Sequence, residues 1–141
     1  MIILMWRILM SRVFRSNYRV YYEDTDAGGV VYNANYLKFA ERARTEVLRS
    51  LNISQDELMR KEGTMFVVRR IEIDFKKPAK LDDLISVETI MGEFKGASTV
   101  WQQNLFFEKI NLCSIKVQLV IVNRNLKPIR VPELLKSSLC G

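Results

Sequence analysis

The 141-residue chain contains no histidine, and it has only two cysteines and three prolines. Without imidazole, a Ser–His or Cys–His nucleophile pair is excluded, and a transition-metal site has too few ligands. Cys113 lies in an alternating apolar segment and Cys140 is the penultimate residue, with no CxxC spacing. We interpret them as one buried thiol and one tail thiol in a reducing compartment.

The chain also lacks an apolar run long enough to cross a membrane. Its apolar N-terminal segment, MIILMWRILM, covers ten residues, about half of what a spanning helix needs. This segment has neither a basic leader nor a small-residue cleavage pattern, so we do not expect a signal peptide. We expect residues 1–17 to be a flexible extension and residues 18–141 to be one cytoplasmic domain, without stable membrane insertion. A start at Met10 and contact with a membrane surface are the alternatives.

The charge balance favours an anionic partner. Lysine and arginine number 22 against 16 acidic residues, giving a net charge of +6 and a pI near 9.5. Nucleic acid, an anionic membrane surface and a polyphosphate-bearing ligand all fit this charge. With 48% hydrophobic residues, the composition is that of an ordinary globular protein.

Hydrophobic periodicity predicts one long helix followed by long strands. A short strand is expected at Arg19–Glu23, and a helix of about 16 residues from Asn35. A shorter helix follows, with Ser54 as its N-cap and Gly63 at its end. Strands are expected at 65–75, 84–94, 98–107 and 112–122, and a helical turn at the C-terminus. This order is α+β, a long central helix wrapped by a curved antiparallel sheet whose edges favour dimerisation.

The segment DTDAGGVVYNANY, residues 24–36, carries the clearest chemical signal. Its glycines allow close approach to the backbone, and the helix start after it offers unpaired amides to a developing oxyanion. A carboxylate opposite those amides could activate water or attack a carbonyl directly, which suits a thioester better than an amide. The structural alternatives are an Asx turn at Asp24 and helix N-caps at Asn33 or Asn35.

The run YYEDTDAGGVVYNANYLKFAERARTEVLRSLNIS, continued by FVVRRIEIDFKKPAKLDDLISVET, resembles the YbgC-type acyl-CoA thioesterases. These are hot-dog-fold relatives of 4-hydroxybenzoyl-CoA thioesterase, and the likeness covers about Tyr18 to Pro132. The resemblance implies a hot-dog fold and hydrolysis of acyl-CoA to a free acid and coenzyme A. It implies no cofactor, since coenzyme A is part of the substrate, and a homodimer or homotetramer.

The resemblance assigns the catalytic carboxylate to Asp26, acting as general base or nucleophile, and the carbonyl-polarising amide to the backbone of Asn33. The family usually has histidine at position 33, so a contribution from that side chain would be changed here. Glu41, in ERAR, is a secondary catalytic candidate whose alternatives are an ion pair with Arg44 or a bond to the neighbouring loop. Substrate contacts are expected from Gly28, Gly29, Val30 and Tyr32.

Basic residues are candidates for the nucleotide phosphates of coenzyme A: Arg69, Arg70, Lys76, Lys77 and Lys95. A non-catalytic module that binds acyl-CoA or acyl carrier protein is the alternative function. A nucleic-acid binder is a third and weaker reading, because Trp101 and the phenylalanines near it are expected to pack in the sheet rather than stack on bases.

Overall fold

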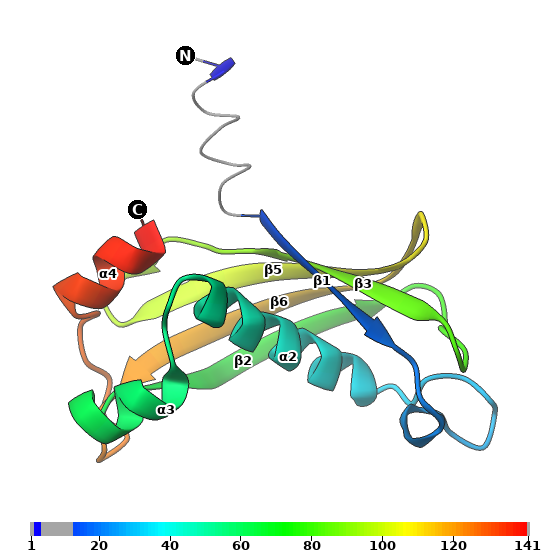
Figure 1. Cartoon of the computed structure of the whole chain (residues 1–141), viewed down its shortest axis with the longest axis horizontal. Helices are drawn as coiled ribbons and strands as arrows, with labels where there is room; N and C mark the ends of the chain where they lie inside the picture. The colour runs from blue at the N-terminus through cyan, green and yellow to red at the C-terminus, as the bar shows by residue number, and fades with distance from the viewer. Residues whose placement is uncertain (1, 4–12, 141) are drawn as a thin grey trace.

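A computed structural model describes residues 2–3 and 13–140 of the chain. One long helix, α2 (Asn35–Ser50), lies across a curved antiparallel sheet (Figure 1). The strand order is β1-β3-β5-β6-β2, and β4 pairs with β5. The strands are β1 (Val13–Arg19), β2 (Met65–Phe75), β3 (Leu84–Ile90), β4 (Phe94–Lys95), β5 (Ser98–Phe107) and β6 (Ile110–Val122). This is the predicted α+β hot-dog architecture.

Helix α2 supplies the centre of the core. It spans 16 residues, as predicted, and it buries a face that includes Phe39, Ala43 and Val47. The Phe39 ring is 1% exposed and lies 6.0 Å from the Tyr18 ring of β1, centroid to centroid. Burial of a phenylalanine side chain of this kind stabilises the fold by about 1.5–3 kcal/mol. The helix is therefore fixed against the sheet, and its N-terminus has a defined position.

The first strand differs from the prediction. Strand β1 covers Val13–Arg19, and the last two residues of the predicted strand Arg19–Glu23 belong to a short 3-10 turn, η1 (Tyr22–Asp24). Residues from Val13 onward pair with β3, ahead of the predicted domain boundary at residue 18. The remainder of the predicted N-terminal extension falls almost entirely outside the described residues.

Strand β2 carries a bulge that the sequence pattern did not predict. The register of β2 on β6 shifts between Val68 and Arg70. Because one extra residue reverses the alternation, Phe66 rather than Val67 shares the helix-facing side with Ile71. At the other end of the strand, Phe75 lies edge-on to Tyr36 of α2, with ring centroids 5.8 Å apart.

Two shorter helices complete the described chain. Ser54 accepts a hydrogen bond from the Glu57 N–H at 3.3 Å and caps α3 (Gln55–Glu57), which continues as the wider turn η2 (Leu58–Glu62). Gly63, at φ +63°, ends this segment as predicted. Helix α4 (Glu133–Cys140) packs Leu135 and Leu139 into the core. No helix among the described residues is long and apolar enough to span a bilayer.

Candidate active site

Residues 24–32 form a small hairpin ahead of α2, drawn in light blue at the right of Figure 1. The Asp26 N–H donates to Val30 O at 2.9 Å, and the Gly29 N–H donates to Asp26 O at 3.0 Å. Gly29 has φ +79°, a conformation that favours glycine. A hydrogen bond from the Val31 N–H to Ala79 O, 2.9 Å long, ties the hairpin to the segment after β2. Backbone hydrogen bonds thus hold the loop in a defined conformation.

Asp24 is buried and holds this region together. One carboxylate oxygen accepts from the Tyr21 N–H at 2.8 Å and the other from the Asn35 side-chain amide at 2.9 Å. Asn35 is therefore the first residue of α2 rather than its N-cap, and the cap position is taken by Ala34 without a side-chain bond. Asp24 joins the 3-10 turn to the helix start, and both of its oxygens are occupied.

Asp26 lies two residues on and is exposed. One carboxylate oxygen accepts from the Gly28 N–H at 2.8 Å, and no group in the described part of the chain bonds the other oxygen. A Cβ on Gly28 would stand 3.2 Å from that first oxygen, so a larger residue there would crowd the carboxylate. The carboxylate is held at one oxygen and available at the other.

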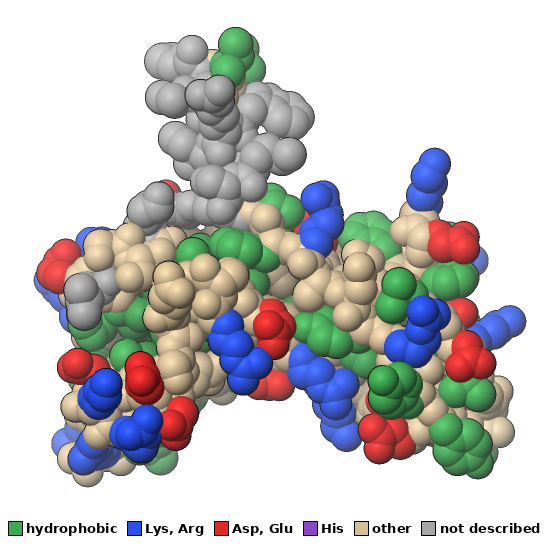
Figure 2. Space-filling model, in the orientation of Figure 1, with side chains coloured by type: hydrophobic (Ala, Val, Ile, Leu, Met, Phe, Trp, Pro, Cys, Tyr) green, Lys and Arg blue, Asp and Glu red, His purple; other side chains and the backbone are tan. Residues whose placement is uncertain are grey.

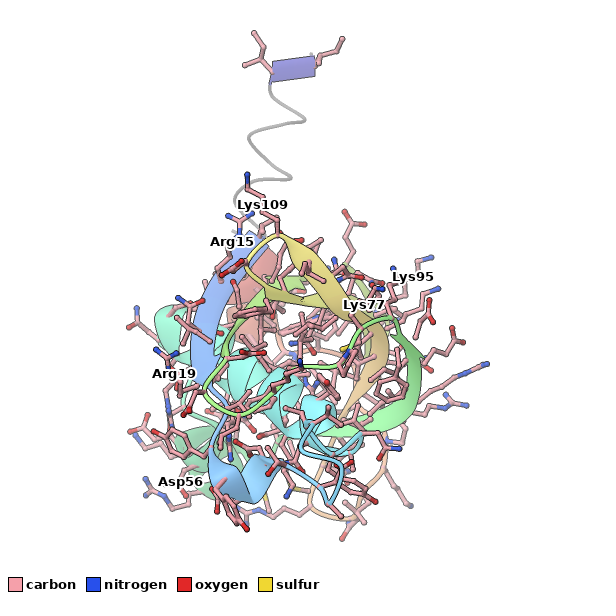
Figure 3. All side chains as sticks on the ribbon, turned by 90° about the vertical axis from the view of Figure 1, so that its right-hand side faces the viewer. Arg15, Arg19, Asp56, Lys77, Lys95 and Lys109 are labelled. Carbon is pink, nitrogen blue, oxygen red and sulfur yellow. The ribbon has the colours of Figure 1, made fainter. Side chains whose placement is uncertain are left out.

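Asp26 borders an open depression of about 450 Å³ at the start of α2. The residues that line it are Asp26, Val30, Val31, Tyr32, Asn33, Tyr36, Phe75, Lys76, Lys77 and Pro78. Within the described residues, the backbone N–H of Asn33 has no hydrogen-bond acceptor. An ionisable carboxylate and an unpaired amide donor thus share one cavity, with apolar walls and two lysines. Figure 3 looks at this end of the molecule and labels Lys77 on the segment after β2.

Tyr36, a buried residue of α2, forms part of the wall of the depression. Its hydroxyl accepts a hydrogen bond from the Ala79 N–H at 3.0 Å. Burial raises the pKa of Tyr36, and the charge of nearby Asp26 raises it further. The ring is therefore neutral and anchored. From the sequence, only its place in the NANY segment could have indicated that Tyr36 lines the cavity. Its helical spacing does not show this, because core residues and cavity residues of a helix follow the same spacing.

Of the other predicted substrate residues, Val30 and Tyr32 line the depression. Gly29 borders a neighbouring hollow that also includes Asp26. The three predicted phosphate contacts Arg69, Arg70 and Lys95 are exposed and do not line either cavity.

Glu41 does not line the Asp26 depression of its own chain. It accepts a hydrogen bond from the Thr45 hydroxyl at 3.2 Å and borders a separate pocket with Arg44. The alternative ion pair with Arg44 is not formed within 4.0 Å, although the Glu41 charge raises the pKa of Arg44 against the lowering effect of burial.

The central helix wrapped by a curved antiparallel sheet is the hot-dog fold, and the comparisons with known proteins place it among the thioesterases. The model of the thioesterase superfamily matches residues 28–114. The acyl-CoA thioesterase YbgC of Haemophilus influenzae is 44% identical over 131 residues, 92% of this chain and 96% of that protein. The YbgC of Helicobacter pylori is 36% identical over 131 residues, 86% of this chain and 96% of that protein. The chain therefore belongs to the thioesterase superfamily, in its YbgC group.

Solved structures agree with this assignment. A probable thioesterase from Bartonella henselae matches with a TM-score of 0.82 and 37% identity, over 85% of this chain and 99% of that chain. A 1,4-dihydroxy-2-naphthoyl-CoA thioesterase from Synechocystis has a TM-score of 0.85 at 20% identity, over 92% of this chain and 96% of that chain, which supports the fold alone. The family resemblance and the enzyme class predicted from sequence are confirmed.

Proposed function

We propose that this acyl-CoA thioester hydrolase uses Asp26 as its catalytic carboxylate and the Asn33 backbone amide as its oxyanion donor. The observation that carries the proposal is their position on one depression, each with an unpaired atom. A thioester carbonyl that accepts from the Asn33 N–H is polarised there, and its oxygen gains negative charge as the tetrahedral intermediate forms. The side chain of Asn33 is not needed for that role.

Two routes are open to the free oxygen of Asp26. As a general base it takes a proton from water, the hydroxide oxygen bonds to the carbonyl carbon, and the C–S bond breaks to release the coenzyme A thiolate. As a nucleophile it bonds to the carbonyl carbon itself and expels the thiolate, leaving a mixed anhydride that water then cleaves. Both routes consume one water and give a carboxylic acid and coenzyme A.

A single-turnover experiment in ¹⁸O-labelled water distinguishes the routes. With enzyme in excess over acyl-CoA, label in Asp26 is expected only when water attacks the aspartyl carbon of an anhydride. Unlabelled Asp26 is expected both from the general-base route and from attack on the acyl carbon of an anhydride, and trapping of the anhydride separates these two. Mass spectrometry of the peptide containing Asp26, combined with trapping of the anhydride by hydroxylamine, reads out both outcomes. An Asp26→Asn enzyme that turns over acyl-CoA as fast as the native chain would contradict the proposal for either route.

Variants at position 33 test the amide. Asn33→Ala keeps the N–H and should keep most of the turnover, whereas Asn33→Pro removes the N–H. Loss of one oxyanion donor lowers kcat by about 10²–10³-fold. A proline enzyme that folds and retains its turnover would remove the amide from the mechanism.

Binding and assembly extend the proposal. Lys76 and Lys77 line the depression, and we propose that they bind the phosphates of coenzyme A or the phosphopantetheine of an acyl carrier protein. We further propose a homodimer formed through β2, since this edge strand of 11 residues exposes Val68 and Phe75 to 46% and 50%. The proposed dimer can be tested by sedimentation, and a tetramer would pair two such dimers.

A further inference from the structure

A second pocket lies between α2, α3 and β2, away from Asp26. It has a volume of about 100 Å³ and includes the side chains of Arg44, Thr45 and Leu48 from the helix. Phe66 and Val68 of β2 form part of its wall. Figure 2 shows the lower margin of the molecule hollowed between the α3 lobe and the loop before α2, with acidic and basic side chains at the rim. A pocket of this size accepts only a compact group.

Arg44 gives this pocket its polar character. It is 9% exposed, and its one hydrogen bond among the described residues runs from Nη1 to the Gln103 side-chain oxygen at 2.9 Å. No carboxylate of the described chain lies within 4.0 Å of it. A guanidinium has five N–H donors, so a largely buried arginine here retains donors for an external oxygen. Glu41 also lines this pocket, and its charge partly offsets the lowering of the Arg44 pKa by burial.

In a dimer paired through β2, the Asp26 depression of one subunit and the Arg44 pocket of the other lie at the same interface. Phe75, at the end of β2, lines the Asp26 depression, whereas Phe66 and Val68, near its beginning, line the Arg44 pocket. When two copies pair through β2 about a two-fold axis, the strands run antiparallel, so the end of one lies beside the beginning of the other. The Asp26 depression of one subunit then adjoins the Arg44 pocket of its partner.

We propose that the Arg44 pocket of one subunit receives the acyl group cleaved at Asp26 of the other, and that Arg44 selects acyl groups bearing an oxygen acceptor near their end. The inference rests on the proposed function and on the β2 dimer. An acyl group that ends in a methyl group would displace water from the guanidinium and offer no hydrogen-bond acceptor in its place. A carbonyl or hydroxyl oxygen would instead accept a hydrogen bond from a guanidinium N–H. A site built around such a donor discriminates strongly against analogues that lack the oxygen.

Matched substrates test the selection. In each of the pairs 3-oxobutanoyl-CoA with 3-methylbutanoyl-CoA and 4-oxopentanoyl-CoA with 4-methylpentanoyl-CoA, a carbonyl oxygen replaces a methyl group and a hydrogen on one carbon. We expect kcat/KM to favour the oxo member of at least one pair by roughly 10-fold or more, and Arg44→Met to abolish that preference. Arg44→Lys should restore part of it, and Arg42→Met, which removes an exposed charge from the same helix, should leave it unchanged. No preference in either pair, or a preference that survives Arg44→Met, overturns the selection.

Mixed oligomers test the arrangement and do not require Arg44 to be replaced. Val68→Phe places a larger ring at the pocket wall, where the native side chain is 46% exposed. Chains carrying Asp26→Asn and Val68→Phe should each have low activity toward the 4-oxopentanoyl thioester. Co-expressed with two different tags and purified through both, they form dimers with one fully native composite site, and about half of the native activity should return.

If both cavities served the same subunit, neither site of the mixed dimer would be native and no activity would return. Recovery therefore supports the composite site, and its absence in doubly tagged dimers overturns it. Failure of the proposed function itself looks different, since the Asp26→Asn homodimer would then turn over these thioesters as fast as the native enzyme.

Discussion

Asp24 and Asp26 are separated by a single residue, and the structure predicts opposite consequences when each is changed to asparagine. Asp24 is 5% exposed, and each of its oxygens accepts a hydrogen bond. Asp26 is exposed and accepts only from the Gly28 N–H. Asp24→Asn should therefore destabilise the fold, and Asp26→Asn should stop turnover in a fold that is as stable as before.

The hydrogen bonds of the two carboxylates set the expected size of each effect on stability. In Asp24→Asn the new amide turns its NH₂ toward one of two donors, so one charge-assisted hydrogen bond is lost and its donor is left unpaired, at about 2–4 kcal/mol. For a chain of this length that loss lowers Tm by on the order of 10 °C. Asp26→Asn keeps an oxygen for the Gly28 N–H and should change stability by about 0.5 kcal/mol or less. Its loss of general-base or nucleophilic function should lower kcat by about 10²–10⁴-fold, or about 3–5 kcal/mol in the barrier.

Thermal unfolding by circular dichroism and release of coenzyme A thiol give the two measurements on each protein. Glu23→Gln, which removes an exposed charge from the same segment, serves as the control and should alter neither quantity. An Asp24→Asn protein with native Tm would refute the structural role. An Asp26→Asn protein within a few-fold of native turnover would refute the catalytic one.

Three further predictions concern residues around the site and the core. Gly29→Ala forces a side chain into φ +79° and should cost about 1–2 kcal/mol in urea unfolding, and an unchanged midpoint would contradict that backbone assignment. Tyr36→Phe leaves the buried Ala79 N–H without its acceptor and should destabilise by about 1–3 kcal/mol in the same assay, more than a surface tyrosine would. Burial raises the pKa of the Cys113 thiol to about 12, above the value near 8.5 of an unfolded chain. Since the unfolded state loses the proton first, stability in a Cys140→Ser background should fall as pH rises from about 9 towards 12, by up to about 1.4 kcal/mol per unit, and Cys113→Ala should remove that slope.

The sequence was sufficient where local chemistry sets the structure. Helix α2 and the cap and end of α3 follow from apolar spacing, a serine before an acidic turn and a terminal glycine, none of which needs long-range information. The first strand was misplaced because aromatic, β-favouring residues at Tyr21 and Tyr22 were outweighed by Asp24, whose bond to the Tyr21 N–H closes a turn. Position in the sheet is decided by pairing with β3, which the sequence does not display.

The bulge in β2 is a second feature that could not be predicted from the sequence. Strict alternation places Val67 on the helix side, but the extra residue between Val68 and Arg70 brings Phe66 and Val68 to that side instead. A bulge depends on how β2 aligns with β6, and its strand sequence carries no glycine or proline to reveal it. The Arg44 pocket was missed for the same reason, because part of its wall comes from the residues that the bulge redirects.

The hairpin explains how a histidine-free site can keep its geometry. The Asn33 amide is positioned by bonds on both sides of it, the Tyr32 N–H to Asp24 O at 2.9 Å and the Asn35 N–H to Tyr32 O at 2.8 Å. Neither of these bonds involves the Asn33 side chain, which is exposed. A change from the family's usual histidine therefore alters what the side chain offers to a bound acyl group without moving the amide. Backbone hydrogen bonds on either side of residue 33, rather than the identity of that residue, therefore determine where the proposed oxyanion donor lies.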